Sequence, residues 1–416
     1  MEKLVGLDTF ALAQLDTIRQ KDTLRLSLDL AERLAEAGDL GLFADRYRLY
    51  AAEADTIGAA LYPNPQFSFN TTNINGGNLR DALNGIGTSY RIDQTILLGG
   101  KLSNKIAVVD ETTAAKRAEF VREVFTVRAD TRDAVTDASY QLQQIEVAQE
   151  QYAEFAKLIE ASKVQLKAGE IAEEELLKLE LQELTYRQAL SQSQQVLTEA
   201  MSKLREHLHV DTTIPISIEY TLRMTGKQFN RDSLLALAYN CRADYWAQEH
   251  ALRATEYQMR LAQANVWPDL NIGIELDHIS AVNTLNPNTL GGGVGIAIPI
   301  FSRNQDDVVR SDANHRAAQY DLESIRANIS LEVLSSLDKY ENSLSMLQSL
   351  NVDALHLALE VRHTAEYNYE ARRISLLDLL ATENVTTAAI AGYYAALYQL
   401  AKNQVTLERA VGVELF

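Results

Sequence analysis

The sequence is poor in cysteine, proline and basic residues, and each shortage argues against a particular kind of structure or partner. Cys241 is the single cysteine among 416 residues, so neither an intrachain disulfide nor a cysteine zinc site can form. Six prolines are few for this length and suit long uninterrupted helices. Lys and Arg number 39 against 57 Asp and Glu, giving a formal net charge of −18. Because nucleic-acid affinity rests on basic residues, we expect no nucleic-acid partner.

Long apolar runs and enzyme motifs are also absent. No run of about 18 apolar residues occurs, so no transmembrane helix is expected, although the weaker signals of a membrane β-barrel stay open. The N-terminus, MEKLVGLDTFALAQLD, carries acids in its apolar stretch and does not resemble a signal peptide. The chain is therefore either cytoplasmic or a mature form with a replaced Met1. Phosphate-loop, nucleophile-elbow and zinc-protease motifs are missing, so we expect neither an enzyme nor a cofactor.

An internal repeat with an offset of about 204 residues is the most informative feature that is present. Three segments recur in the same order at nearly one offset. They are 62–64 with 267–269, 94–97 with 298–301, and, without gaps, 168–177 with 371–380. The repeat predicts one structural plan used twice, in a first half at 1–209 and a second half at 230–416, joined by a linker at 210–229.

Each half is expected to contain two strands and long helices. Period-two alternation of apolar and polar residues marks a strand with one apolar face. It predicts strands at 66–75, 88–97, 269–279 and 293–300. Breaker-free stretches predict long helices at 104–165 and 304–369 and further helices at 172–208, 231–265 and 375–411. Met1 to Asp22 and a strand signal at 214–220 predict small mixed patches.

The predicted helices carry a seam that needs partners. From 104 to 165 a helix would span roughly 93 Å. Apolar residues recur along it with coiled-coil spacing. The seam comprises Phe120, Val124, Val127, Thr131, Ala134, Ala138, Gln141, Ile145, Ala148, Tyr152, Phe155 and Ile159. One narrow protomer cannot bury such helices, nor protect the open edges of four strands. A ring of copies solves both problems, and three copies give twelve strands.

The element order, the repeat and the turn segments resemble the TolC-like outer-membrane efflux protein family over nearly the whole chain. Segments 62–65, 94–101 and 298–305 look closest to its cation-efflux branch of the Czc and Cus type. The resemblance implies an α+β fold in an elongated homotrimer. It would have a 12-stranded β-barrel on a long helical barrel of antiparallel coiled coils, with a small mixed equatorial region. The lipid-bearing cysteine that many members carry at the N-terminus is missing here.

The repeated helix-turn-helix tips are the first candidate site. The resemblance implies that they face the periplasm and dock an adaptor protein, which links the channel to an inner-membrane pump. The residues concerned are Ala168, Gly169, Glu170, Ile171, Ala371, Arg372, Ile374 and Ser375, with both isoleucines expected to be exposed. The alternative is an ordinary helical hairpin with Ser375 as an N-cap.

Asp378 and its repeat partner Glu175 are candidates for a periplasmic entrance gate. The resemblance implies that an aspartate at this place lines the closed entrance, where three carboxylates would attract cations and resist crowding. The alternative is an acid that suits the positive end of the helix dipole. Arg372 and Arg373 are expected to tie the tips together by ion pairs.

Two further sets of polar residues are candidate sites, four charged residues of the strands and two histidines. Arg91, Asp93, Glu275 and Asp277 would face a water-filled barrel lumen, as in any such barrel. His207 and His209 lack an acidic or cysteine partner at ligand spacing, so no metal site is expected.

The sequence thus predicts an outer-membrane channel subunit, lying in outer-membrane lipid with a periplasmic helical extension. It would be a passive export conduit of a tripartite efflux system, with metal cations as the first cargo and drugs or other small molecules as the alternative. A soluble coiled-coil scaffold is the competitor from another class, but it does not account for four alternating strands.

Overall fold

The computed structural model describes residues 23–73, 86–280 and 288–416. The chain divides into two compact units. Unit 1 comprises the described residues up to Ala44, Val121–Arg242 and Ala327–Phe416; unit 2 comprises Asp45–Phe120 and Ala243–Arg326. Each unit contains residues from both predicted halves of the sequence, so the two compact units do not coincide with the two halves. The boundaries at 209 and 230 stay a prediction about the repeat in the sequence. The predicted patch at Met1 to Asp22 lies outside the described residues.

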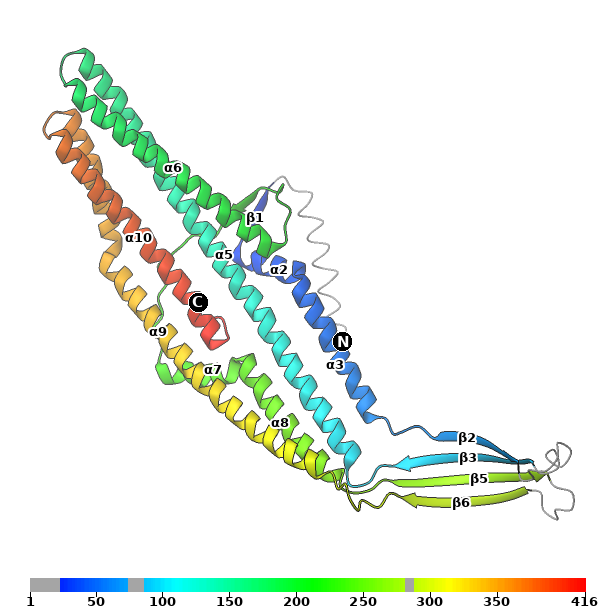
Figure 1. Cartoon of the computed structure of the whole chain (residues 1–416). Helices are drawn as coiled ribbons and strands as arrows, with labels where there is room; N and C mark the ends of the chain where they lie inside the picture. The colour runs from blue at the N-terminus through cyan, green and yellow to red at the C-terminus, as the bar shows by residue number, and fades with distance from the viewer. Residues whose placement is uncertain (1–22, 74–85, 281–287) are drawn as a thin grey trace. The chain divides into compact units, whose positions relative to one another are not determined.

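Unit 2 contains a four-stranded antiparallel sheet in the order β2-β3-β5-β6 (Figure 1). Its strands are β2 (Gln66–Asn73), β3 (Ile86–Ile96), β5 (Leu270–Ser280) and β6 (Asn288–Ile296). The last strand was expected at 293–300, but it begins at Asn288 and ends at Ile296. The central pair, β3 with β5, joins the two halves of the sequence.

The register of the sheet places apolar and charged residues on opposite faces. Phe67, Ile92 and Ile274 lie directly opposite one another across the first three strands. Arg91, the neighbour of Ile92 in β3, is likewise opposite Glu275, the neighbour of Ile274 in β5. Because directly opposed residues share a face and neighbours along a strand alternate, the sheet has one apolar and one polar face.

The helices of unit 2 are α8 (Ala243–Ala264), most of α3 (Leu40–Ala60) and the first parts of α5 (Lys101–Lys167) and α9 (Gln305–Glu370). Gly99 and Gly100, both with positive φ, make the corner between β3 and α5. Lys101 fixes this corner through an ion pair of 2.6 Å with Asp269, which precedes β5.

The helix expected at 231–265 is wrong as a single element. The structure has α7 (Arg231–Cys241) and α8, separated at Arg242, which adopts an extended conformation. The Nη1 atom of Arg242 donates a hydrogen bond of 3.0 Å to the carbonyl oxygen of Ala410 and lies 2.5 Å from Glu332. Contacts with residues far along the chain thus interrupt the helix, where no Pro or Gly marks the break.

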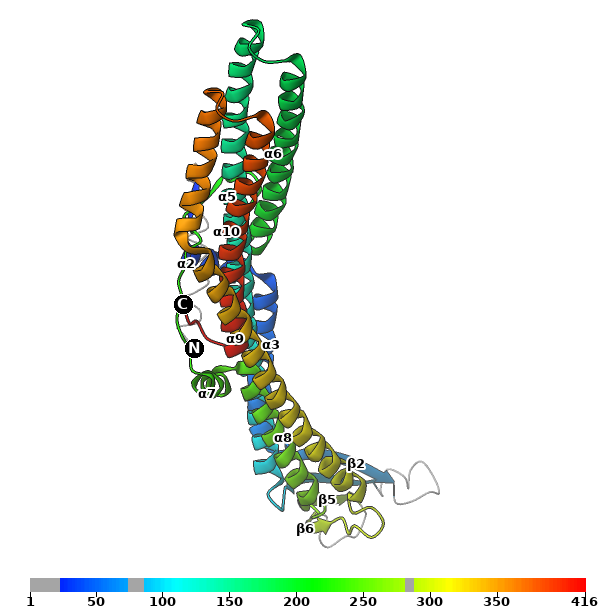
Figure 2. The ribbon, with the colours of Figure 1, turned by 90° about the vertical axis from the view of Figure 1, so that its left-hand side faces the viewer.

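Unit 1 contains two helical hairpins. One consists of α5 and α6 (Glu173–Leu208), and the other of α9 and α10 (Leu376–Val411) (Figure 2). A small mixed patch adds α2 (Leu28–Gly38) and two short parallel strands, β1 (Leu24–Leu26) and β4 (Ile216–Ile218). The predicted strand signal at 214–220 contains β4. Buried residues of β1, α2, α5 and α6 form one hydrophobic cluster here.

The predicted seam of α5 faces inward within the single chain, so the expectation that one protomer cannot bury it is wrong: the other helices and the mixed patch cover it. All twelve positions are buried or half-buried, and Thr131 and Ala138 are fully buried. Near Ala134, Arg132 forms an ion-paired hub that the sequence did not reveal: it contacts Glu32, and lies 2.7 Å from both Glu408 and Glu414. Within the described parts of the chain, no helix is long and apolar enough to span a membrane.

Candidate functional site at the helical tips

The two tips share one backbone motif. The amide of Gly169 bonds to the Leu166 carbonyl and that of Glu170 to the Gln165 carbonyl. At the other tip, the amides of Arg372 and Arg373 make the equivalent bonds to Tyr369 and Asn368. This pairing is the Schellman ending of a helix, and it needs a left-handed residue. Gly169, with φ of 72°, adopts this conformation freely, whereas Arg372, with φ of 59°, does so at a cost of about 1–2 kcal/mol.

Asp378 forms a capping box with Ser375 at the start of α10. Its Oδ2 atom accepts hydrogen bonds from the Ser375 hydroxyl at 2.7 Å and from the Ser375 amide at 3.2 Å. These bonds to the side chain and backbone of Ser375 hold the pKa of Asp378 below its usual value. The structure therefore shows the helix-start role that the sequence left as the alternative. The entrance role requires several copies and stays a prediction.

Two side-chain contacts join the tips. Arg372 forms an ion pair with Glu170, and both side chains are about half exposed. The Tyr369 hydroxyl donates a hydrogen bond of 2.9 Å to Oε1 of Glu175. Burial of Tyr369, together with this bond to a carboxylate, raises the pKa of the phenol to about 12. Arg373 does not take part, because its guanidinium lies over the ring of Tyr367, 5.8 Å from the centroid.

A hydrophobic cluster supports both tips from within. It comprises Phe155, Leu158, Ile159, Leu176, Leu179, Tyr186, Ala365, Tyr369, Leu376 and Leu379. Ile171 and Ile374 are half-buried and pack against this cluster, so the prediction that they are exposed is wrong. They anchor the turns instead. Ala168 and Ala371 are exposed as expected, and Leu177 and Leu377, at 57% and 77% exposed, present the large apolar side chains.

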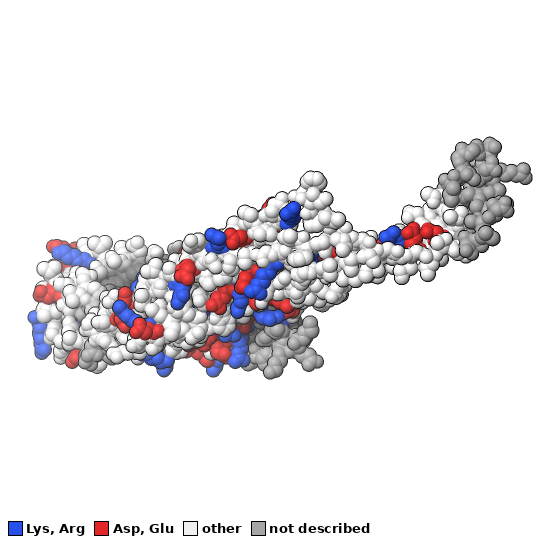
Figure 3. All heavy atoms as spheres, turned by 90° about the horizontal axis from the view of Figure 1, so that it is seen from below, with Lys and Arg blue, Asp and Glu red and all other residues white. Residues whose placement is uncertain are grey.

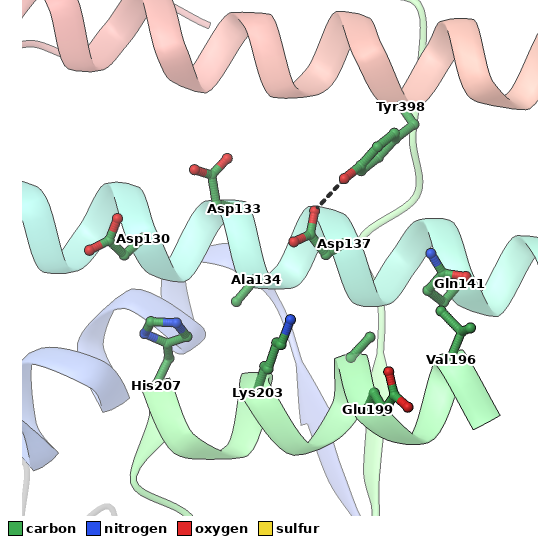
Figure 4. A pocket seen from close by; sticks show the side chains of 11 residues that line it. Asp130, Asp133, Ala134, Asp137, Gln141, Val196, Glu199, Lys203, His207 and Tyr398 are labelled. Atoms are coloured by element: carbon green, nitrogen blue, oxygen red, sulfur yellow. Dashed lines mark hydrogen bonds between the residues drawn. The ribbon is translucent and has the colours of Figure 1, made fainter. Parts of the chain in front are cut away.

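A polar pocket of about 300 Å³ lies among α5, α6 and α10 of unit 1 (Figure 4). Its three aspartates already have cationic or hydroxyl partners, with Asp130 lying 2.7 Å from Arg409. Asp133 and Asp137 each lie 3.1 Å from Lys402, and the Tyr398 hydroxyl donates a bond of 2.8 Å to Asp137. His207 lines this pocket, whereas His209 lies near Asp39. No group of three metal-ligating side chains occurs among the residues described.

The predicted lumen residues come together on the polar face of the sheet. Arg91 lies 2.8 Å from Asp93 and 3.5 Å from Glu275. Asp277 stands opposite Ser89 and Thr289, on the same face as Glu275. On the side of the molecule seen in Figure 3, basic and acidic residues are intermingled rather than gathered in patches of one sign. That this face lines a lumen stays a prediction.

Comparison with known proteins shows a sequence similarity in the second half of the chain and a shared fold over nearly all of it. Residues 234–413 match the sequence model of the family described as outer membrane efflux protein. A comparison with curated protein sequences found no match. Among solved structures, the channel-forming protein CusC is 16% identical with a TM-score of 0.77, covering 95% of this chain and 94% of its own.

Two further structures have the same fold. VceC, an outer membrane protein of Vibrio cholerae, is 14% identical with a TM-score of 0.75, covering 93% of this chain and 96% of its own. The open state of the MtrE outer membrane channel of Neisseria gonorrhoeae is 16% identical with a TM-score of 0.73, covering 93% and 89%. The second half of the chain is thus similar in sequence to the outer membrane efflux protein family, and nearly the whole chain shares the fold of these solved channels.

Proposed function

We propose that the chain is one subunit of a trimeric outer-membrane channel that serves as a passive export conduit of a tripartite efflux system. It is not an enzyme. Three sheets would close into one barrel, and three sets of hairpins would close into a periplasmic helical tube. The family match and the fold support a channel, and the sheet supports its closure into a ring.

The sheet carries the proposal. Among the described residues, β2 pairs only with β3 and β6 only with β5, so each leaves one edge without a strand partner. Phe67, Ile274 and Val294 on its apolar face are 61–70% exposed. Exposed edges and an exposed apolar face promote aggregation in water. Closure of three copies into a barrel of twelve strands in lipid would pair the edges and cover the apolar face. Arg91 and Glu275 would then face the water-filled interior.

The helices support the same ring. Leu177, Leu181 and Leu184 lie on one face of α6 at a spacing of one and two turns. They are 57%, 67% and 55% exposed. A neighbouring copy packed along α6 would cover this apolar row. A soluble scaffold of one chain would leave it in water, and would have no use for the long strands.

Solubility and mass test the trimer. Purified in detergent, the protein should show a protein mass three times that of the 46.4 kDa chain, after the micelle is subtracted. The measurement is light scattering coupled to refractive index and absorbance. A monodisperse monomer that stays soluble without detergent would refute the channel.

The exposed turns are the proposed docking surface for a periplasmic adaptor. Ala168 and Ala371 are both exposed at the ends of the hairpins. In a Cys241→Ser background, cysteines placed at these positions should form crosslinks with an adaptor co-expressed in cells. A cysteine at exposed Gln258 on α8 is the matched control and should not. Equal crosslinking at all three positions would argue against docking by the tips.

For the cargo we propose metal cations, on the sequence resemblance to the cation-efflux branch and the excess of acidic residues; small organic molecules are the alternative. Cells that lack their own outer-membrane channels and carry this protein with its cognate pump should resist one class of compound. Restored resistance to metal salts but not to dyes or drugs supports the cation conduit. The opposite pattern supports the alternative.

A further inference from the structure

A buried carboxyl group lies between the two hairpins, two turns along α10 from the tip. Glu383 is 5% exposed, although glutamate is rarely buried without compensation. The ionisable groups around it come from every helix of the bundle. They are Glu366 and Arg362 on α9, Glu154 on α5 and Tyr186 on α6, with His363 acting on Glu366.

Positive charge is in short supply in this cluster. Arg362 acts on both Glu366 and Glu383, and its Nη2 atom already lies 3.2 Å from Oε2 of Glu154. Oε1 of Glu383 is buried without a hydrogen-bond donor among the described residues. One guanidinium therefore serves the buried Glu383, the half-buried Glu366 and Glu154, whose side chain is 42% exposed. Burying a second net negative charge here would be costly.

One bound proton resolves this conflict. Glu366 and Glu383 repel each other when both are charged, and two interacting carboxyl groups can form a hydrogen bond only when one of them carries a proton. Burial, followed by the charge of Glu366, raises the pKa of Glu383 to about 7. Burial and the charge of Glu154 raise the pKa of Glu366 as well. Tyr186, with its pKa raised to about 12 by burial and by Glu383, stays neutral.

We propose that Glu366 and Glu383 share one proton and form a proton-binding site that holds the bundle of the two hairpins together. When the proton leaves to water, two carboxylates repel each other at the contact between α9 and α10. The hairpin then packs less tightly, from Glu383 down to the turn that carries Asp378. An effect on an entrance at the tips rests on the proposed function; the proton site itself does not.

The sign of the pH dependence follows from linkage. The closed bundle holds the proton up to about pH 7, whereas an opened bundle exposes Glu383 with its ordinary pKa near 4.5. Opening should therefore become about tenfold more frequent for each pH unit between these two values, and constant above pH 7. Tight packing is fully present below pH 4.5 and is lost as the pH rises to 7.

Hydrogen exchange of the full-length protein in detergent tests this. Glu383→Gln keeps the size of the side chain and is permanently uncharged, so its opening should not vary with pH in this way. The ratio of wild-type to variant exchange rates in the first four turns of α10 cancels the intrinsic pH dependence of exchange. We expect this ratio to rise from pH 5 to 7 and then level off. Glu360→Gln, exposed on α9, is the control and should behave as wild type.

Infrared titration gives a second measurement on the wild type, which remains decisive if the variant folds poorly. A protonated carboxyl band should disappear with a midpoint near pH 7 and should be weakened in Glu366→Gln. A flat exchange ratio, or carboxyl bands that all titrate near the ordinary value, would overturn the proton site. Because neither readout needs a conducting channel, failure of the site and failure of the proposed function are distinguishable.

Discussion

The hydroxyl group of Tyr369, at the end of α9, lies 2.9 Å from Oε1 of Glu175, in the first turn of α6 and 194 residues earlier in the chain. The ion pair between Arg372 and Glu170 lies in the adjacent turns. The two hairpins therefore have a half-buried link and an exposed link close to their tips. Any movement that separates the hairpins at this end must break both.

Tyr369→Phe should loosen the tips while leaving the hydrophobic cluster intact. The variant removes only the hydroxyl group, and hydrogen bonds to charged acceptors contribute about 1.5–3 kcal/mol. We expect faster hydrogen exchange at residues 369–376 and more frequent opening in single-channel recordings. Tyr367→Phe, at an exposed position on the same helix, is the control. Unchanged exchange in Tyr369→Phe would mean that packing alone holds the tips.

The Arg372–Glu170 pair should contribute less and should depend on salt. Because both partners are about half exposed, the coupling energy from a double-mutant cycle should be about 0.2–1 kcal/mol. Reversing the charges in Arg372→Glu with Glu170→Arg should restore part of the loss of either single variant. The thermal unfolding midpoints at low and high salt supply the measurement. A coupling that persists in 1 M salt would show that the contact is not electrostatic.

Asp378→Asn separates the two roles of this aspartate. If three copies ring an entrance, the variant should weaken block by multivalent cations in planar bilayers, most strongly at low salt. Ser375→Ala is the control, because it removes the capping partner and keeps the carboxylate. The capping contribution should be present above the usual pKa of 3.8 and be lost as the pH falls through the lowered pKa. Equal effects of both variants on cation block would leave Asp378 as a helix-start acid alone.

The sequence predicted what depends on local pattern. Period-two alternation at Phe67, Ile92 and Ile274 marked the strands and their apolar face. Freedom from Pro and Gly marked the long helices. Prediction from the sequence failed where contacts between residues far apart in the chain determine where an element ends. The break at Arg242 is set by Glu332 and Ala410, and no local signal announces it.

The candidate site shows the same division. Ser375 and Asp378 fit a capping pattern that a sequence displays directly, three residues apart. Ile171 and Ile374 were misjudged because exposure in a turn depends on the cluster beneath it. Tyr369 was missed because its partner lies on another helix. The hub at Arg132 was missed for the same reason, with Glu32 and Glu408 lying 100 and 276 residues away in the chain.

The two faces of the sheet should tolerate charge differently. Arg in place of Ile274, which is 61% exposed on the apolar face, should impair membrane insertion, because Arg at the midplane costs about 2–4 kcal/mol. Asp277→Arg is the matched control on the polar face, opposite Ser89 and Thr289. Glu275→Arg, on the same polar face, is a poorer control because it would face Arg91. The heat-stable oligomer in membrane extracts is the readout, and equal yields would contradict the assigned faces.

The pairing of β3 with β5 has a consequence for biosynthesis. Arg91 and Glu275 stand opposite each other in the ladder although 184 residues separate them. A ribosome adding 5–20 residues per second needs roughly 10–40 s to make that stretch. Throughout this interval the edge of β3 that later pairs with β5 has no partner strand. The nascent pair of β2 and β3 therefore exposes both a free edge and an apolar face. We expect newly made chains to depend on a holding chaperone, and chains released after residue 230 to aggregate when that chaperone is depleted.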